Sequence, residues 1–232
     1  MTFGVEDWVT IFAQVLERLP LTLLILTLSL VCSLIVGGIL ALIRIARLPI
    51  FHPIATVYLS FTRSTPLIVQ LFLVYFGIPQ LLLAIGIDIN HWSRITFVVI
   101  TFALHTGAYM SEVFRSAYQS VDKGQVEAAY SVGMTYPQAL RRIILPQATV
   151  AALPNLGNHT IELLKDTALA FTIGIIDIMG QVKLIIGNNY GLGMFEVYVA
   201  IAIVYWAICI AIELGVLGLE RLFIKGRASI TK

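Results

Sequence analysis

Long apolar segments separated by short polar ones dominate the pattern of this chain. Five apolar segments reach the roughly 20 residues that a helix needs to cross a bilayer. They occupy residues 19–43, 54–78, 95–115, 143–170 and 194–217. Charged residues make up only 12% of the chain, against about 25% in a typical soluble domain. The pattern predicts an all-α polytopic membrane protein, with residues 1–232 forming one transmembrane domain.

Two apolar regions are interrupted by polar residues or proline. The second segment contains the run Arg63–Pro66, which breaks its apolar character near the middle. Residues 173–189 are also apolar, but Asp177, Gly180 and Lys183 interrupt them. The sequence therefore predicts a break within the second segment, and a short or re-entrant helix between the fourth and fifth.

The stretch 120–142 is polar and basic, unlike the segments on either side. Asp122 is placed to cap a short helix, and Gly133 stands where a helix favours a left-handed terminator. Thr135, with Gln138 three positions later, is placed to start a second helix. We therefore expect two short helices with a tight bend between them. Because such a segment cannot lie in lipid, it must dock on another structure.

The distribution of lysine and arginine predicts how the chain crosses the membrane, because cytoplasmic loops carry an excess of positive charge. Three positive residues (Arg18, Arg94 and Lys183) fall on one side of the predicted spans, and ten of the 15 fall on the other. The ten are Arg44, Arg47, Arg115, Lys123, Arg141, Arg142, Arg221, Lys225, Arg227 and Lys232. This bias predicts an external N-terminus, a cytoplasmic C-terminus and a cytoplasmic 120–142 loop.

One face of the fourth segment is polar. At about 100° per residue, six polar side chains share a stripe about 120° wide; they are Asn155, Asn158, His159, Glu162, Lys165 and Asp166. A polar stripe on a spanning helix lines a cavity or a contact with a partner, since a charge at the bilayer centre costs roughly 2.5–3.5 kcal/mol. Lys165 is placed to bind a carboxylate or to pair internally with Glu162, and the sequence leaves both possibilities open.

The 120–142 loop and its flank also carry a recognisable motif. Glu127-Ala128-Ala129, Gly133 and then Ile143-x-Leu145-Pro146 have the spacing of the EAA loop, and this resembles the permease subunits of ATP-binding-cassette importers. Arg63-Ser64-Thr65-Pro66-Leu67, followed by Gln70-Leu71-Phe72, resembles a segment of polar amino-acid permeases, with Ser64 where that family usually has glycine. Leu164–Gly174 is most similar to the cystine-type members.

The resemblance implies a type I importer permease fold and a set of partners. The EAA loop would be a coupling helix that inserts into a cytoplasmic ATPase, formed by Glu127, Ala128, Ala129, Gly133, Arg141 and Pro146. The alternative is a solvated cytoplasmic loop. The implied partners are two copies of an ATP-binding subunit, a second permease (an identical copy or a sister chain) and an extracytoplasmic solute-binding protein. The implied location is the cytoplasmic membrane, crossed several times.

The expected cargo is a polar L-amino acid, with cystine favoured. The predicted substrate path comprises Asn158, Glu162, Lys165, Asp166, Arg63, Ser64 and Gln70. A zwitterionic amino acid needs a cation for its carboxylate and an acceptor for its ammonium group, and these residues offer both. Arg63 has a second interpretation, in which backbone carbonyls at the break near Pro66 hold its side chain.

Several function classes are disfavoured by what the sequence lacks. It shows no metal-ligand constellation, no nucleophile–base arrangement, no nucleic-acid-binding basic cluster and no GxxxxGK[ST] phosphate loop. We therefore expect no enzymatic activity and no cofactor in this chain, with ATP and magnesium bound by the partner ATPase. The alternative function is a secondary amino-acid transporter, or a channel-like membrane protein without an ATPase.

Overall fold

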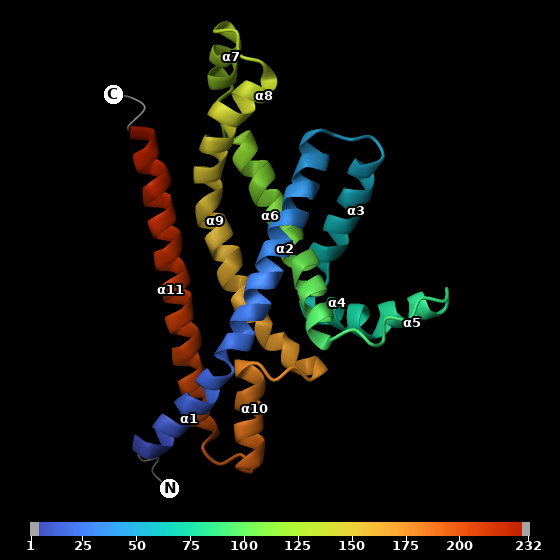
Figure 1. Ribbon diagram of the computed structural model, residues 1–232, viewed down its shortest axis with the longest axis vertical. Helices are drawn as coiled ribbons and strands as arrows, with labels where there is room; N and C mark the ends of the chain where they lie inside the picture. Colours follow the sequence, from blue (N-terminus) through green and yellow to red (C-terminus); the bar gives the residue numbers. More distant parts are fainter. Residues whose placement is uncertain (1–4, 229–232) are drawn as a thin grey trace.

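The chain folds as a bundle of helices, shown in Figure 1. This computed structural model describes residues 5–228, with side chains for 6–223. No strand occurs within that part of the chain, so the all-α expectation is confirmed. Lys232, one of the positive charges counted above, lies outside the described residues, as do the side chains of Lys225 and Arg227.

The first span is longer than the sequence predicted. Helix α1 (Val5–Glu17) is followed after one residue by α2 (Leu19–Ile45). The two together form an apolar rod of 40 residues from Glu6 to Ile45, which includes the predicted span 19–43.

The region of the second predicted span is sharply bent. Helix α3 (Phe51–Ser64) is followed by α4 (Leu67–Phe72), a π-helical turn (Leu73–Gly77) and α5 (Ile78–Leu83). The axis turns by 114° between α3 and the α4–α5 unit, which projects sideways from the bundle in Figure 1. Thr65 and Pro66 have extended backbones at the bend, because proline lacks an N–H and disfavours a helical residue before it.

The remaining elements follow the predicted order. They are α6 (Arg94–Gln119), α7 (Lys123–Ser131), α8 (Tyr136–Ala139), a π-helical turn (Leu140–Ile144), α9 (Leu145–Asp166), a 3-10 segment (Thr167–Ile173), α10 (Ile178–Asn188) and α11 (Met194–Ala228). The segment that ends at Ile173 is bent by 49° relative to α10. In the described residues three helices are long and apolar enough to cross a membrane, or up to five when each bent pair counts as one span.

Both π-helical turns come shortly before a proline. The turn Leu73–Gly77 precedes Pro79, and the turn Leu140–Ile144 precedes Pro146. A proline within a helix removes one backbone hydrogen bond and collides with the carbonyl four residues earlier. A wider turn relieves that collision and lets the helix continue. The second of these turns joins α8 directly to α9.

Helices α2 and α6 approach each other closely at two glycines. A Cβ atom added to Gly37 would lie 2.9 Å from Met110 Cβ, and one added to Gly107 would lie 2.9 Å from Val36 Cγ1. Small residues at such positions let two helix backbones come together, as is common in membrane bundles. This contact fixes α6, the helix that carries several polar side chains described below.

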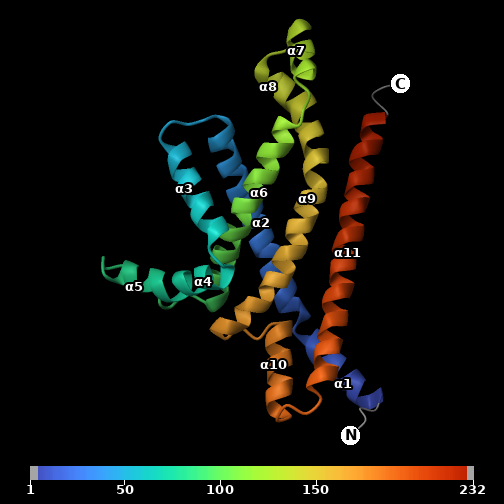
Figure 2. The same cartoon turned by 180° about the vertical axis from the view of Figure 1, so that it is seen from behind.

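The two largest apolar clusters of the described residues hold the bundle together. The first lies between α2, α4, α6 and α9 and includes Ile25, Leu71 and Phe102, all fully buried. The second joins α1, α10 and α11 around Ile178 and Val182. Figure 2 shows α9 and α11 running side by side, with α10 at one end.

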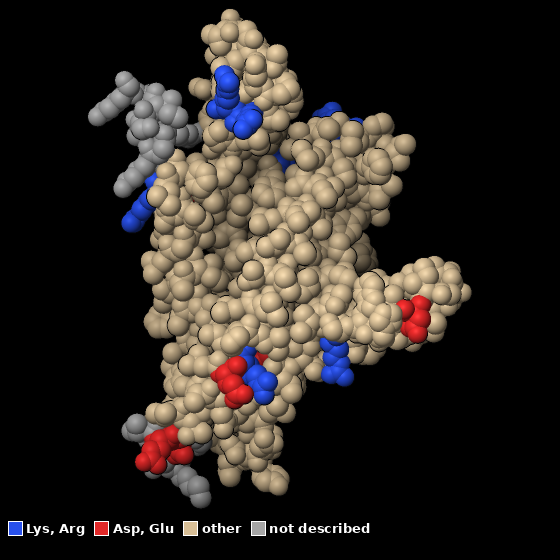
Figure 3. Space-filling model, viewed as in Figure 1, with Lys and Arg blue, Asp and Glu red and all other residues tan. Residues whose placement is uncertain are grey.

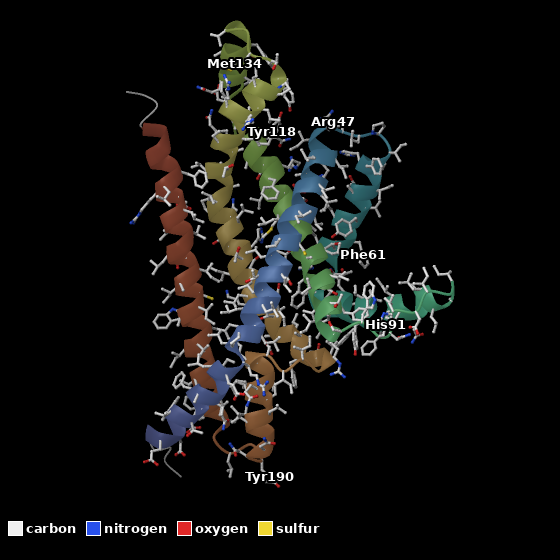
Figure 4. All side chains as sticks on the ribbon, viewed as in Figure 1. Arg47, Phe61, His91, Tyr118, Met134 and Tyr190 are labelled. Atoms are coloured by element: carbon white, nitrogen blue, oxygen red, sulfur yellow. The ribbon has the colours of Figure 1, made fainter. Side chains whose placement is uncertain are left out.

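The molecule has two distinct ends. Helices α7 and α8 project at one end, near the C-terminal end of α11, and α1 and α10 lie at the other (Figures 1 and 2). Met134, between α7 and α8, and Tyr190, after α10, mark these opposite ends in Figure 4.

Candidate functional site

The projecting loop has the predicted caps and bend. Asp122 Oδ1 accepts a hydrogen bond of 2.6 Å from the Gly124 amide at the start of α7. Gly133 follows α7 with a φ of +80°, a left-handed conformation that favours glycine. Thr135 and Gln138 then form a capping box at the start of α8, where the Thr135 amide donates to Gln138 Oε1 at 2.8 Å. The prediction of two short helices around Gly133 is confirmed.

Most of the predicted coupling residues lie on the surface of this loop. Glu127, Ala128, Gly133, Arg141 and Pro146 are exposed. Ala129 differs, because only 2% of its surface is accessible. Ala129 therefore packs inside the loop, and of the alanine pair only Ala128 is exposed to a partner. The exposed residues leave this end of the molecule open to a partner.

A row of polar side chains follows one face of α6. His105, Tyr109 and Glu112 are spaced at i, i+4 and i+7, so they lie above one another on the same side of the helix. The ring centroids of His105 and Tyr109 are 5.2 Å apart, and that of Tyr109 is 5.7 Å from the His159 ring on α9. This face of α6 therefore meets the polar stripe of α9.

A polar cavity lies between α6 and α9. It has a volume of about 290 Å³ and is lined by His105, Thr106, Tyr109, His159, Glu162 and Asp166. Small-molecule sites usually have volumes of roughly 300–1,000 Å³. The cavity is therefore of a size that suits a small ligand, and its two carboxylates provide acceptors for a cationic group. We call it the α6–α9 cavity.

The carboxylate of Glu162 is held by its own helix. His159 Nδ1 lies 2.7 Å from Glu162 Oε2, at the i, i+3 spacing that brings two side chains together on a helix. The Glu162 side chain nevertheless stays 64% exposed. The partner of Glu162 is thus His159 and not Lys165, so the internal Lys165–Glu162 pair left open by the sequence is not formed.

Gln70 stabilises the bend between α3 and α4. Its Nε2 donates to the carbonyls of Thr62 at 2.8 Å and Thr65 at 3.0 Å, and lies 2.8 Å from Thr65 Oγ1. Its Oε1 lies 3.1 Å from His105 Nδ1. Because the amide nitrogen already faces oxygens, Oε1 is the acceptor and His105 donates from Nδ1. Gln70 is buried, and it positions the break and His105.

Three arginine side chains gather around Glu112. Glu112 Oε1 accepts from Arg44 Nη1 at 2.5 Å, and Oε2 accepts from Arg115 Nη2 at 2.8 Å. Arg63 Nη1 lies farther away, 3.5 Å from Oε1. The Arg63 guanidinium is also 5.9 Å from the ring centroid of Tyr109, within the range of a cation–π contact. Side chains hold Arg63, so the expectation of bonds to backbone carbonyls is not met.

The structure divides the predicted substrate-path residues into three groups. Glu162 and Asp166 line the α6–α9 cavity, and Arg63 reaches Tyr109 at its edge. Asn158 and Lys165 are exposed and lie outside that lining. The remaining residues are Ser64, which lines a second cavity described below, and Gln70, which holds the bend. The cation near the cavity is therefore Arg63, on a different helix from Lys165.

His105, Thr106, Tyr109 and His159 line the cavity but were absent from the predicted substrate path. His159 belonged to the stripe on the fourth segment, so its position was available from the sequence. The α6 residues show the same signal: polar side chains at helical spacing on an apolar span. Applying the stripe argument to the third segment would have identified His105 and Tyr109.

Charge is unevenly distributed between the two ends. In Figure 3 the visible acidic side chains lie only in the half that holds α1 and α5, whereas the α7–α8 end shows basic side chains. Lys123, Arg141 and Arg142 are exposed at that end. Glu6 and Asp7, in the first turn of α1, are exposed at the other.

These features define the class of the protein. Apolar helices, a charged cavity between two of them and an exposed helical loop at one end describe a helical integral membrane transport component. The chain belongs to the family of inner membrane components of binding-protein-dependent transport systems, whose profile matches residues 29–225. Permease subunits of this family are not themselves enzymes.

Known proteins with similar sequences and structures support the assignment to this family. Over 196 residues the chain is 50% identical to the L-cystine transport system permease protein TcyL of Bacillus subtilis, covering 84% of this chain and 81% of that protein. It is 44% identical over 207 residues to the probable amino-acid permease protein YxeN of the same organism, covering 88% and 90%. A solved structure, "Crystal structure of an amino acid ABC transporter with histidines", superposes with a TM-score of 0.82 at 33% identity, covering 95% and 99%.

Proposed function

We propose that this chain is the permease subunit of an ATP-binding-cassette importer that carries a polar L-amino acid across the cytoplasmic membrane. L-cystine is the first candidate cargo. The permease of an L-cystine transport system is 50% identical over most of both chains, which supports that choice. Only 12% of the residues are charged and the mean hydropathy is +0.92, so the chain is strongly apolar. The path of a polar cargo must therefore use the few charged side chains of the protein.

The observation that carries this proposal is the placement of opposite charges around the α6–α9 cavity. Glu162 and Asp166 supply acceptors for an ammonium group. The guanidinium of Arg63 lies over Tyr109 at the cavity edge and supplies a cation for a carboxylate. A zwitterionic amino acid needs both kinds of group. His105, fixed as an Nδ1 donor by Gln70, leaves Nε2 as a hydrogen-bond acceptor when the ring is neutral.

The proposed orientation places the α7–α8 end in the cytoplasm. The positive-inside rule supports this choice, because exposed Lys123, Arg141 and Arg142 gather at that end. Glu6 and Asp7 then face outward with α1. This arrangement corresponds to an external N-terminus and a cytoplasmic C-terminus.

ATP hydrolysis belongs to separate subunits in this proposal. Because the sequence has no GxxxxGK[ST] phosphate-binding loop, we place ATP with Mg²⁺ on two copies of a cytoplasmic ATPase and expect no cofactor on this chain. The α7–α8 loop would insert into one ATPase, the second permease would contact the other, and each loop would transmit ATPase closure as a rigid-body movement. Because the loop continues through the turn Leu140–Ile144 into α9, that movement would reach Glu162 along one helical segment.

Two further partners complete the importer. The described residues hold at most five spans, which are too few to enclose a path, so a second permease, an identical or a sister chain, faces this one. An extracytoplasmic solute-binding protein delivers the amino acid to the α1–α10 end. The family is one of binding-protein-dependent systems, so membership favours this arrangement over a secondary transporter that works without an ATPase.

Uptake by the reconstituted complex tests the proposal. Proteoliposomes would contain the permease and its ATPase, with ATP inside and the binding protein and radiolabelled L-cystine outside. We expect uptake that requires both ATP and the binding protein. A panel of L-histidine, L-glutamine and L-arginine then ranks the substrates. Uptake at the same rate without ATP would contradict the importer mechanism, and uptake of none of these amino acids would contradict the substrate class.

A further inference from the structure

A second cavity lies between α2, α3 and α6. Its volume is about 450 Å³, and its polar lining consists of Arg44, Thr56, Ser60, Arg63, Ser64 and Glu112. This second cavity is closer to the α7–α8 end of the molecule than the α6–α9 cavity is. Its Glu112 follows His105 of the α6–α9 cavity by seven residues, or about 10 Å along α6. We call it the α3 cavity.

Positive charge exceeds negative charge around the α3 cavity. Three guanidinium groups surround the single carboxylate of Glu112, at 2.5 Å for Arg44, 2.8 Å for Arg115 and 3.5 Å for Arg63. The two closer arginines each take one carboxylate oxygen, so Arg63 is the most weakly held. An uncompensated charge inside a membrane protein is costly and usually marks a functional site. The excess of positive charge favours an anionic ligand.

Arg63 lines the α3 cavity and contacts one lining residue of the α6–α9 cavity. Its guanidinium lies 5.9 Å from the centroid of Tyr109, which lines the α6–α9 cavity. Its side chain is 50% exposed, whereas that of Arg44 is 19% exposed. Arg63 is therefore the accessible cation of the cluster. Its position in the last turn of α3, directly before the bend, places it between the two cavities.

We propose that the α3 cavity is a second binding site for the α-carboxylate of the transported amino acid, on its way to the α7–α8 end. The proposal rests on the proposed function above. The incoming carboxylate competes with Glu112 for Arg63, and the hydroxyls of Ser60 and Ser64 lie in the same cavity to donate hydrogen bonds. Because Glu112 can form its ion pair with Arg63 again, the amino acid is bound only briefly and is then released.

Ligand binding to the permease–ATPase complex in lipid nanodiscs tests the site without the binding protein. The probes are radiolabelled L-cystine and cystamine, which has the same disulfide-linked diamine but no carboxylates. Gln in place of Arg63 should weaken cystine binding by about 10- to 100-fold, as expected for a lost charge-assisted bond. Cystamine binding should change by less than about 2-fold. Arg63→Lys keeps the charge but loses the planar fork, so its effect should be intermediate.

Arg47→Gln is the matched control, because Arg47 is exposed at the end of α2 and is not part of the cavity lining. It should leave both affinities unchanged. Because Arg63 also contacts Tyr109 of the α6–α9 cavity, Ser60→Ala separates the two cavities: Ser60 lines the α3 cavity and not the other, so its loss should weaken cystine binding by about 2- to 10-fold and leave cystamine binding unchanged. The carboxylate site is contradicted if Arg63→Gln weakens cystine and cystamine equally, if it weakens neither, or if Ser60→Ala leaves cystine binding unchanged. If Arg63→Gln does not fold, Arg63→Lys replaces it in the same comparison. An Arg63→Lys ratio of cystine affinity to cystamine affinity equal to the wild-type ratio then contradicts the site.

A lipid phosphate is the other source of an anion, and the nanodisc composition distinguishes it. Wild-type cystine affinity should be the same in pure phosphatidylcholine and with phosphatidylglycerol added. A several-fold loss with phosphatidylglycerol that disappears in Arg63→Gln would assign the cavity to a lipid headgroup and overturn the proposal. A wild-type complex that binds no cystine contradicts the proposed cargo instead, and the comparison then uses the amino acid selected by uptake and its decarboxylated amine.

Discussion

Gln70 of α4 and His105 of α6 are joined by a hydrogen bond of 3.1 Å between Oε1 and Nδ1. The same Gln70 side chain closes the bend between α3 and α4 through the carbonyls of Thr62 and Thr65. One buried residue thus determines both the direction of α4 and the tautomer of a histidine in the α6–α9 cavity. This relationship connects the fold to the candidate site.

Replacing Gln70 should destabilise the protein. Gln70→Ala leaves the Thr62 and Thr65 carbonyls and the His105 ring nitrogen without their partner, at a cost of about 1–3 kcal/mol for each buried unsatisfied group. Thermal unfolding of the detergent-solubilised protein measures the effect. Gln80→Ala is the control, because Gln80 is exposed on α5. Equal unfolding midpoints for the two variants would show that Gln70 does not hold the bend.

Glu162 and Lys165 should differ in their effects on uptake, although they lie one turn apart. Glu162→Gln removes a carboxylate from the α6–α9 cavity, so we expect the KM for the amino acid to rise about 10-fold, equivalent to about 1.4 kcal/mol. Lys165→Gln should change KM by less than about 2-fold, since Lys165 is exposed outside the lining. Co-purification with the ATPase should be normal for both. The opposite ranking of KM would restore Lys165 as the substrate cation.

Gly133 should be required for coupling. An alanine at its φ of +80° is strained by roughly 1–2 kcal/mol, so Gly133→Ala should distort the loop between α7 and α8. We expect substrate-stimulated ATP hydrolysis by the complex to fall, with little change in amino-acid binding by the permease. Gly187→Ala is the control, because nothing lies within 4 Å of the added Cβ and its φ is not positive. Full stimulation in Gly133→Ala would mean that the loop conformation does not matter.

A methyl group should be tolerated at Gly38 of α2 but not at Gly107 of α6, where the two helices are in close contact. A Cβ at Gly107 would lie 2.9 Å from Val36 Cγ1 and 3.2 Å from the Ser33 carbonyl, and Gly107→Ala should therefore cost about 1–3 kcal/mol. Gly38 has nothing within 4 Å, so Gly38→Ala should be neutral or slightly stabilising. Thermal unfolding of both variants checks the pair. Equal midpoints would argue against a close approach of the helices.

Local patterns along the sequence predicted the helices and the loop well. The caps at Asp122 and Thr135 and the bend at Gly133 depend on residues within three or four positions of one another, and all three are confirmed. The polar residues Arg63–Pro66 indicated a break in the second span. The angle of 114° at that break was not predictable, because it depends on Gln70 and on packing against α6.

The composition of the candidate site was harder to predict, because it combines helices far apart in sequence. The stripe on the fourth segment identified Glu162 and Asp166, but a stripe about 120° wide does not show which edge faces another helix. Lys165 lies at one edge of the stripe, where it is exposed and outside the cavity lining, so the stripe alone did not show that Arg63 is the cation nearer the cavity. Arg63 reaches Tyr109 only through the bend after α3, a tertiary relationship that periodicity within one helix does not contain.

The most direct test of the central claim, that the α6–α9 cavity holds the transported amino acid, is a cryo-electron microscopy structure of the permease–ATPase complex with L-cystine. We expect density for the amino acid between His105, Tyr109, His159, Glu162 and Asp166, with its ammonium group toward the two carboxylates. An empty α6–α9 cavity, with the amino acid bound to other residues of a complex active in uptake, would contradict the claim.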